Sequence, residues 1–518
     1  MKRRKFLRHL THSVAIPGLV GSLGLSNGYG SQLESLLRRA SAEGKALVLI
    51  FLEGGNDGLN TLIPLDAMSA LNNVRPHVIL PENKLIKLPG QDLALHPSLQ
   101  DFKSLYTEGR LGIVQSAGYP DQNFSHFRST DIWMSGSDSN ELVNSGWIGR
   151  YLNNEFPGFP EQFPTEENPD PLAIEIGSGG SLLFQGPSAS MGMVLSGADS
   201  FYKLINNEEE EAPATNAGDK LRYIRLIARQ ADQYGEVVVN AATKIKQQAN
   251  YADDQLSQQL KVVARLIAGG LKTPLYLVRL GGFDTHDNQV DSGDHTTGEH
   301  ADLLKNLNDG IMSFMQDLEF LGIDERVVGM TFSEFGRRII SNASLGTDHG
   351  SAAPLFIFGN AVKGGVLGSN PIIDFNAEYN DNIAMQFDFR QVYASVLSQW
   401  FDKNNEAVED IMFRKFDQIP IIGDSSVISS TPENQQLNGI TVYPNPVNSK
   451  TTIQYHSDGS SVSINLINMN GQLVSSIYKG MSNSGINQVR WNSQSIPDGN
   501  YILLIKGRSF SRQLKIIK

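Results

Sequence analysis

The sequence predicts an α/β protein: a doubly wound, mainly parallel β-sheet in the main domain, then a small all-β sandwich. Two apolar, β-prone runs, Leu275–Leu280 and Val327–Phe332, each end in a cluster of Gly, Asp, Glu and His residues. Between them, His300–Phe320 carries apolar residues at helical spacing, as expected for a crossover helix that joins parallel strands. From about residue 439 the pattern changes to short alternating strands with Asn-Gly and Asp-Gly turns, which is typical of an antiparallel sandwich.

The length indicates several domains. At 518 residues the chain exceeds the roughly 100–200 residues of one ordinary domain. We expect a signal peptide at 1–30, an α/β domain at 40–422, a polar linker at 423–438 and the sandwich at 439–518. The near-continuous apolar run Ala46–Leu52 and the run Leu111–Gln115 are further strand candidates, because parallel strands covered on both faces are apolar throughout.

Composition restricts the chemistry. A formal charge of −12 argues against a nucleic-acid partner, because binding phosphates requires a basic surface. The chain has no cysteine, which excludes disulfides, thiolate ligands and a cysteine nucleophile. Any metal must therefore be held by His, Asp, Glu or neutral oxygen donors.

The N-terminus has the features of an export signal. Arg3 and Arg4 open the run RRKFL, and a mildly apolar, Gly-rich stretch follows at Val14–Leu25. That stretch is too short for a membrane span, which needs about 20 apolar residues. The pattern resembles a twin-arginine signal and implies the twin-arginine translocase as a partner. A basic amphipathic helix is the alternative.

The first candidate ligand follows the run Ala46–Leu52. Glycines flank Asp57 in the sequence GGNDG, so the backbone can turn sharply and project the carboxylate from the strand end, where it could hold a cation. The alternative is a turn in which local backbone amides satisfy Asp57.

A second candidate group lies at the start of a predicted helix. Ser125 is a good N-cap residue, and that is its structural interpretation. Because a helix N-terminus presents free amides and positive dipole to an anion, Ser125 is also a candidate nucleophile or oxyanion ligand. The neighbouring His126 and Arg128 could bind the same anion.

The remaining candidates follow the ends of the two central apolar runs. Asp284 and His286 come after the first run, Glu334 and Arg337 come after the second, and Asp348–His349 precede a strand-like run at 355–358. In open α/β sheets, ligands bind where parallel strands end. The acidic and imidazole groups therefore predict a metal site, and Arg337 could hold a substrate anion or pair with a structural carboxylate.

Several long phrases resemble one bacterial family. LVLIFLEGGNDGLNTLIPL, SHFRSTDIWMSG, GFDTHDNQ, SEFGRRIISNASLGTDHGSAAP and KGGVLG occur in order across roughly 46–402 and resemble the family known as domain of unknown function 1501. That family is similar to the alkaline-phosphatase-like superfamily, metal-dependent hydrolases and mutases of phosphate and sulfate esters with a doubly wound core. The resemblance implies a nucleophile at Ser125 and metal ligands at Asp57, Asp284, His286, Glu334 and His349.

Two departures from the superfamily pattern matter. Asp284 and His286 are closer together than the usual D-x-x-x-H spacing, and Phe335 follows Glu334 where the superfamily commonly has an Asp-His pair. These departures suit one metal ion in place of two, or a degenerate site. The ligand types fit Zn²⁺, Mn²⁺, Mg²⁺ or Ca²⁺.

The C-terminal segment resembles a second family. Its YPNP opening, NGQLV turn, DGNYIL and basic ending are similar to the type A sorting domain of the type IX secretion system of Bacteroidetes. A carbohydrate-binding sandwich is the alternative, but only Trp491 and a few tyrosines could stack on sugars. The resemblance implies the type IX machinery as a partner and a cell-surface or extracellular location.

Together these features predict a secreted, metal-dependent hydrolase of phosphate or sulfate esters. The alternative, from a different class, is a surface-displayed binding or assembly protein that keeps the fold and has lost catalysis.

Overall fold

The structure is a computed structural model. It describes residues 44–177, 180–195, 234–245, 249–423, 440–443, 447, 451–468, 473–494, 496–507 and 511–518. The predicted signal at 1–30 and nearly all of the predicted linker at 423–438 lie outside the described residues. The chain divides into two compact units, Met1–Ser425 and Ser426–Lys518. Among the described helices, none has the length and apolar character needed to cross a membrane.

A nine-stranded sheet forms the centre of the first unit. Its order is β11 (Gly365–Leu367), β5 (Leu111–Gly118), β10 (Ala353–Phe358), β9 (Val327–Phe332), β1 (Ala46–Glu53), β8 (Leu275–Gly281), β6 (Ala173–Ile176) and β7 (Met193–Leu195), with β12 (Phe387–Asp388) also paired to β5. Strand β10 is antiparallel to both of its neighbours. The other pairs in this sheet are parallel, which confirms the predicted mainly parallel α/β fold.

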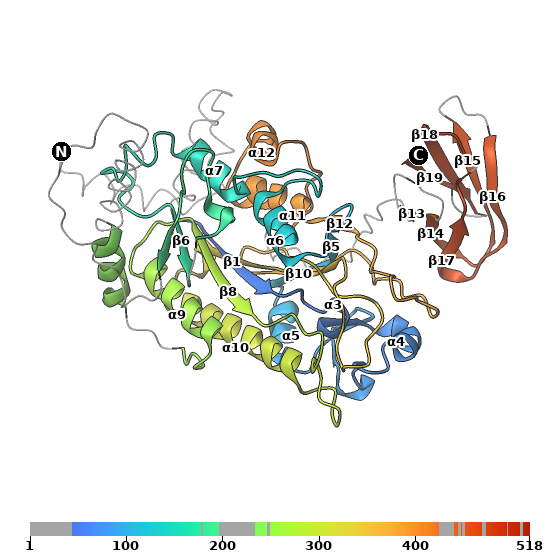
Figure 1. The fold of residues 1–518 in the computed structure, drawn as a ribbon, viewed down its shortest axis with the longest axis horizontal. Coiled ribbons are helices and arrows are strands. Elements are labelled where there is room, and N and C mark those ends of the chain that lie inside the picture. Colours follow the sequence, from blue (N-terminus) through green and yellow to red (C-terminus); the bar gives the residue numbers. More distant parts are fainter. Residues whose placement is uncertain are drawn as a thin grey trace, which may run out of the picture. The chain divides into compact units, whose positions relative to one another are not determined.

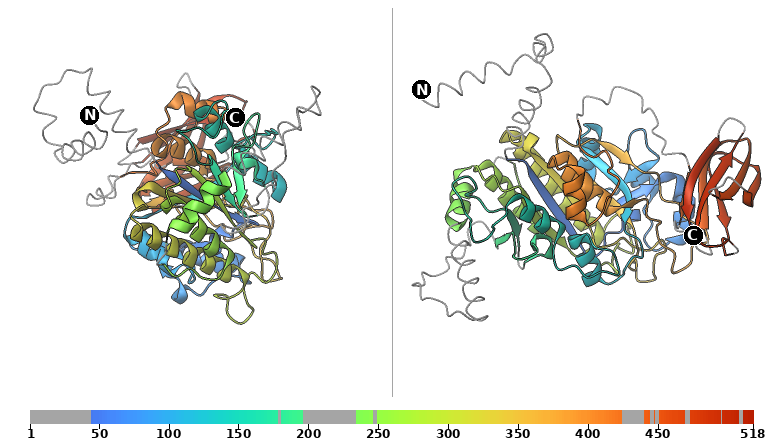
Figure 2. Two further views of the ribbon diagram at one scale, coloured as in Figure 1. Left: turned by 90° about the vertical axis from the view of Figure 1, so that its left-hand side faces the viewer. Right: turned by 90° about the horizontal axis from the view of Figure 1, so that it is seen from above.

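Helices cover both faces of this sheet, as Figure 1 shows and the turned views of Figure 2 repeat. One layer contains α5 (Gln100–Thr107), α9 (Gln255–Ala268) and α10 (Glu299–Phe320). The other contains α6 (His126–Ser135), α7 (Trp147–Glu155), α11 (Phe389–Ser395) and α12 (Asn405–Met412). Strand β1 is apolar throughout because Val48 and Ile50 face the first layer while Leu47 and Leu49 face the second.

Short elements complete the first unit. They are the helices α3 (Gly58–Thr61) and α4 (Met68–Val74), the small sheet of β2 (Leu62–Pro64), β4 (Leu93–Leu95) and β3 (Ile86–Lys87), the 3₁₀ turns η1 (Leu65–Ala67), η2 (Glu82–Lys84), η3 (Leu182–Phe184) and η4 (Asp324–Arg326), and the π-helical turn η5 (Val396–Trp400).

The second unit is a β-sandwich. A three-stranded antiparallel sheet contains β13 (Ile440–Tyr443), β14 (Thr451–Asp458) and β17 (Ser484–Trp491). A four-stranded antiparallel sheet contains β16 (Leu473–Met481), β15 (Ser461–Asn468), β18 (Asn500–Lys506) and β19 (Ser511–Ile517). Both sheets contribute to one core, with Ile453 from the first and Ile464 and Leu503 from the second. The small all-β domain predicted from the alternating pattern is confirmed.

One buried arginine ties together the turns at one edge of the central sheet. Arg337 is fully buried, and its guanidinium donates hydrogen bonds to the carbonyls of Gly55 at 2.8 Å, Thr347 at 2.8 Å and Phe283 at 2.8 Å, and to that of Gly54. These carbonyls lie in the turns after β1 and β8 and in the segment before β10. The arginine thus fixes three chain segments relative to one another.

We expect Arg337→Lys to lower the free energy of unfolding of the first unit by about 2–6 kcal/mol. An ammonium has three donors for five acceptors, and each buried acceptor left unpaired costs about 1–3 kcal/mol. Urea unfolding followed by tryptophan fluorescence measures the change. Arg414→Lys is the control, because its pair with Asp138 is half exposed and such pairs contribute about 0–1 kcal/mol. If both variants lost the same free energy of unfolding, the hydrogen bonds of Arg337 would not have the stabilising role proposed for them.

Candidate metal centre

Four side chains converge at the sheet edge that Arg337 organises. Nitrogen and oxygen atoms from His126, Asp284 and His349 all lie within 4.8 Å of one another. His286 joins them, with its Nε2 at 2.9 Å from His349 Nε2 and 3.3 Å from Asp284 Oδ1. Asp284 is central, because Oδ1 is 3.1 Å from His349 Nε2 and Oδ2 is 3.3 Å from His126 Nε2. We call these four residues the His/Asp cluster.

The sheet topology explains why residues so far apart in sequence meet. Asp284 and His286 follow the carboxyl end of β8, and His126 starts α6 shortly after β5. His349 precedes β10, but β10 runs antiparallel, so its amino end lies at the same edge. Close backbone packing at Gly54 completes the arrangement: a Cβ there would lie 2.2 Å from the Asp284 backbone nitrogen.

Each histidine of the cluster is held from behind through Nδ1. His126 Nδ1 lies 2.9 Å from Glu334 Oε1. His286 Nδ1 lies 2.9 Å from Asp348 Oδ1. His349 Nδ1 lies 2.8 Å from the carbonyl oxygen of Phe124. Such outer partners fix the orientation and tautomer of metal-binding histidines.

These partners make the cluster suitable for a cation. A carbonyl oxygen has no proton to give, so Nδ1 of His349 donates and the neutral ring keeps a lone pair on Nε2. His126 and His286 direct Nδ1 at carboxylates, which can likewise only accept a hydrogen bond when ionised. The Nε2 atoms of all three histidines therefore face the Asp284 carboxylate, with separations of 2.9–3.3 Å within the group. Imidazole nitrogens with one carboxylate are a donor set that zinc and similar ions accept.

The local charges also favour a cation. Partial burial would raise the pKa of Asp284, but the hydrogen bond and the charge of Arg337 oppose it, and the pKa is lowered to about 2. Partial burial lowers the pKa of His349 and so favours its neutral, ligating form. The hydrogen bond with Glu334 raises the pKa of His126. The carboxylates of Asp284 and Glu334 lie near the guanidinium of Arg337, and Asp348 adds a third carboxylate behind His286.

Phe335 packs inside the cluster. Its ring centroid lies 4.9 Å from that of His126 and 4.5 Å from that of His349, and the side chain is buried. The side chain has no metal-binding atom. The two imidazoles also contact each other, with ring centroids 4.4 Å apart, so Phe335 packs against both rings and restricts their orientation.

Glu334 and Asp348 lie behind the histidines rather than beside Asp284. The buried Glu334 carboxylate also accepts from the Gly54 amide at 2.9 Å and the Ser333 hydroxyl at 3.2 Å. Asp348 accepts from Tyr379 Oη at 2.9 Å. Both carboxylates were expected to touch a metal, whereas their contacts here are those of outer partners.

Asp57 lies apart from the cluster. Its buried carboxylate pairs with the guanidinium of the buried Arg75 and accepts from Gln289 Nε2 at 2.6 Å and from the Leu59 amide at 3.2 Å. The last of these bonds caps α3, as the turn interpretation anticipated. A guanidinium thus occupies the place beside Asp57 where a cation was expected.

Ser125 lies beside the cluster. It is the exposed N-cap of α6, and its side chain makes no capping hydrogen bond. Its two neighbours in sequence contact the cluster: the carbonyl of Phe124 holds His349, and His126 faces Asp284. The backbone of Ser125 therefore joins two residues that contact the cluster, and its hydroxyl is not used to cap its helix.

The two arginines expected to bind a substrate anion make other contacts. Arg128 donates to the carbonyls of Asp138 at 3.0 Å and Ser139 at 3.2 Å, so it holds the segment after α6. Arg337 holds backbone carbonyls and donates to Asp284 Oδ1 at 2.8 Å. Burial lowers the pKa of Arg337, although its carboxylate partners oppose the shift.

Sequence reasoning missed four residues around the site: Arg75, Gln289, Arg338 and Tyr379. Tyr379 contacts Asp348, and Arg75 and Gln289 bind Asp57. None of the four is an acidic or imidazole residue, so a search for metal-ligand residue types did not select them. His126 was expected to bind substrate, whereas its Nε2 faces the same carboxylate as the other imidazoles.

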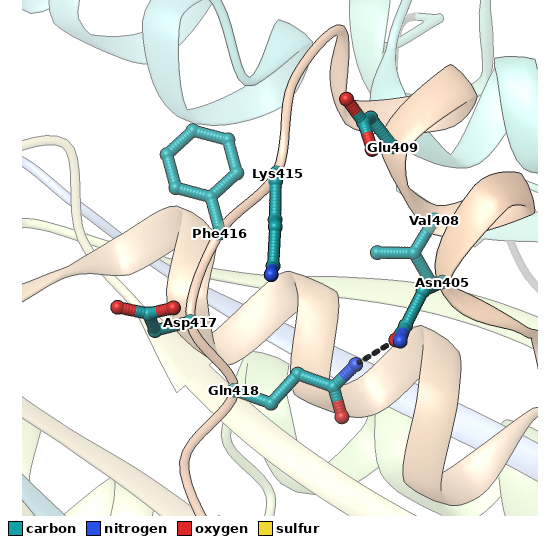
Figure 3. Close-up of a pocket in the computed structure, with 7 residues that line it drawn as sticks. All are labelled: Asn405, Val408, Glu409, Lys415, Phe416, Asp417 and Gln418. Atoms are coloured by element: carbon teal, nitrogen blue, oxygen red, sulfur yellow. Dashed lines mark hydrogen bonds between the residues drawn. The ribbon is translucent and has the colours of Figure 1, made fainter.

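A surface pocket of about 280 Å³ lies elsewhere, between α12 and the segment that follows it. Figure 3 shows its lining residues, which include Lys415, Phe416 and Gln418, and a hydrogen bond of 3.2 Å from Gln418 to Asn405. None of the cluster residues lines it.

Three solved structures illustrate what the chain is similar to. PsFucS1 sulfatase from Pseudoalteromonas sp. has 10% identity over 89% of this chain and 86% of that chain, with a TM-score of 0.34. A protein in the alkaline phosphatase superfamily from Vibrio parahaemolyticus has 9% identity over 93% and 91%, also at 0.34. PorZ of Porphyromonas gingivalis, a surface component of the type IX secretion system, has 21% identity over 17% of this chain and 12% of that chain, at 0.14. At these TM-scores the likenesses say nothing about chemistry. No curated protein matches the chain.

Two families match parts of the chain. Residues 441–518 match the secretion system C-terminal sorting domain, which directs export to the cell surface or extracellular space. Residues 107–412, more than half of the chain, match the other family, and this range contains all four residues of the His/Asp cluster. The chain belongs to the family described as protein of unknown function (DUF1501).

Proposed function

We propose that this protein is a secreted hydrolase of phosphate or sulfate esters that uses one divalent metal ion held by the His/Asp cluster. The observation that carries the proposal is the convergence of His126, His286 and His349 on Asp284 through Nε2, with each Nδ1 engaged by an outer acceptor. Metal-binding histidines almost always donate their other ring N–H to a carboxylate, a backbone carbonyl or water, which is the arrangement that supports this proposal.

One ion, rather than two, fits the surrounding contacts. The carboxylate expected to hold another ion, that of Asp57, is paired with Arg75 and Gln289. Phe335, which follows Glu334, packs against the imidazoles of His126 and His349 and offers no donor. Within the described ranges, one group of His and acidic residues has ligand atoms close enough to share a metal.

The proposed chemistry places Ser125 as the nucleophile. Its Oγ would form a bond to phosphorus or sulfur while the ester oxygen leaves and takes a proton, and water would then hydrolyse the seryl ester. The cation, when bound, supplies positive charge that lowers the pKa of the attacking group and stabilises developing negative charge. Ser125 is the N-cap of α6, and the free amides of the first turn of a helix favour an anion at that end.

A second candidate function is a non-catalytic surface protein that binds a metal or a partner. The observation that favours it is the engagement of both expected anion-binding arginines: Arg128 binds carbonyls after α6, and Arg337 is buried under the strand-end turns. Metal binding without ester hydrolysis would support this function.

Export is proposed to involve two steps. The sorting domain accounts for passage through the type IX system. The twin-arginine signal lies in the part of the chain outside the described residues, and transfer across the inner membrane by that route is a proposal carried by the sequence RRKFL alone.

We expect the purified protein to bind one equivalent of Zn²⁺ or Mn²⁺. Loss of an outer partner typically weakens metal binding by about 10- to 100-fold. We expect His126→Ala to weaken binding by more than this factor, because the substitution removes a ligand atom. Isothermal titration of chelator-treated protein measures both values. His77→Ala, at an exposed position outside the cluster, should leave affinity unchanged. Absence of stoichiometric metal in the unaltered protein would overturn the proposal.

For the metal-loaded protein, we expect Ser125→Ala to lower kcat for an aryl phosphate or aryl sulfate by about 10³-fold or more, since the nucleophile is lost. Metal affinity should stay within about twofold, because Ser125 is not a ligand in the cluster. Thr130→Ala, on the same helix, serves as the control. Unchanged turnover in Ser125→Ala would show that another group, such as a water molecule, attacks the ester.

A further inference from the structure

The three imidazoles of the cluster differ in how deeply their outer partners are held. Glu334, behind His126, is buried, and the partner of His349 is a backbone carbonyl. Asp348, behind His286, is instead completed by an exposed side chain, because its Oδ2 accepts from Tyr379 Oη at 2.9 Å. A continuous chain of contacts thus leads from the exposed Tyr379 to Asp348 and then to His286 Nδ1.

Tyr379 is fixed although its side chain is 57% exposed. The Arg338 guanidinium lies 4.1 Å from the Tyr379 ring centroid, and its Nη1 donates to the Tyr379 carbonyl at 2.8 Å. The same guanidinium donates to the His349 carbonyl at 3.2 Å, and the Arg338 amide donates to the Asp348 carbonyl at 3.0 Å. The tyrosine ring is therefore positioned relative to the segment that carries the outer partner Asp348 and the cluster residue His349.

The loop that carries Tyr379 is anchored at both ends. It lies between β11 and β12, and Ile373 and Ile383 are both buried in a small core that also contains Leu71 and Ile63. The stretch between Ile373 and Ile383 contains Tyr379, which contacts the outer partner Asp348. Tyr379 is held by an anchored loop, a stacked guanidinium and a hydrogen bond to Asp348. It therefore loses conformational freedom that a surface tyrosine without a role would keep.

We propose that Tyr379 is a positioning residue for His286, acting through Asp348 to hold the imidazole in the orientation that binds the metal. This inference rests on the metal site of the proposed function. It assigns to the loop between β11 and β12 a part in metal binding that the ligand positions alone do not reveal.

Two effects of removing the Tyr379 hydroxyl oppose each other. Without its hydrogen bond, Asp348 would carry more negative charge toward His286 and make Nε2 a better donor. Asp348 would also be free to rotate, and His286 would lose its fixed orientation. Loss of outer partners typically costs about 10- to 100-fold in metal affinity, so we expect the loss of orientation to dominate.

The test is Tyr379→Phe, which removes one hydroxyl and keeps the ring stacked under Arg338. We expect the affinity for Zn²⁺, measured by competition with a chromophoric chelator, to fall about tenfold, and the visible absorption of the Co²⁺-loaded protein to change because the ligand geometry changes. Tyr106→Phe, in α5 and away from the cluster, is the matched control and should change neither quantity. Circular dichroism and thermal unfolding check that both variants fold.

A double-mutant cycle shows whether the effect passes through His286. In a His286→Ala background the remaining three ligands form the smallest common zinc site, so residual affinity can be measured. Tyr379→Phe should have no further effect there. An equal loss in both backgrounds, or unchanged affinity and spectrum in the single variant, would overturn the inference while leaving the metal site intact. Failure of the unaltered protein to bind Zn²⁺ or Co²⁺ would overturn the inference and the proposed function together.

Discussion

The candidate site depends on one buried charge, the guanidinium of Arg337. Its donors bind carbonyls in the turns after β1 and β8 and in the segment before β10, and one donor reaches the Asp284 carboxylate. Because Arg337 stays fully buried, its charge acts in a medium of low dielectric constant and is screened little by salt. The same guanidinium therefore holds the strand-end turns in place and keeps the Asp284 carboxylate ionised.

Much of the fold could be predicted because local patterns determine it. The apolar runs became β1, β8 and β9, and the helical spacing at His300–Phe320 became α10. The direction of β10 could not be predicted, because an apolar run of six residues reads the same in either orientation. The direction of β10 matters for the site. His349 precedes β10, and because β10 is antiparallel, this residue lies at the edge where the parallel strands end.

Only part of the candidate site could be predicted from the sequence. Asp284, His286 and His349 lie together, but Asp57 lies apart from them, and which side chains face one another depends on contacts across long sequence separations. Asp57 and Arg75 form a buried pair, and Tyr379 reaches Asp348 from a loop with no recognisable motif. Such pairings depend on packing, for which sequence spacing is no guide. Glu334 and Asp348 contact the Nδ1 side of an imidazole, whereas Asp284 contacts the Nε2 side, and the sequence does not distinguish these positions.

The cluster brings together stretches of the chain that no covalent cross-link joins. His126, Asp284 and His349 come from three distant parts of the sequence, and the chain has no cysteine with which to form a disulfide. An ion bound by all three would act as a cross-link, because the unfolded chain cannot present the same donors together. The folded state would then gain stability as the free metal concentration rises. For a protein exported to the cell surface or the medium, the supply of metal outside the cell would set part of its lifetime there.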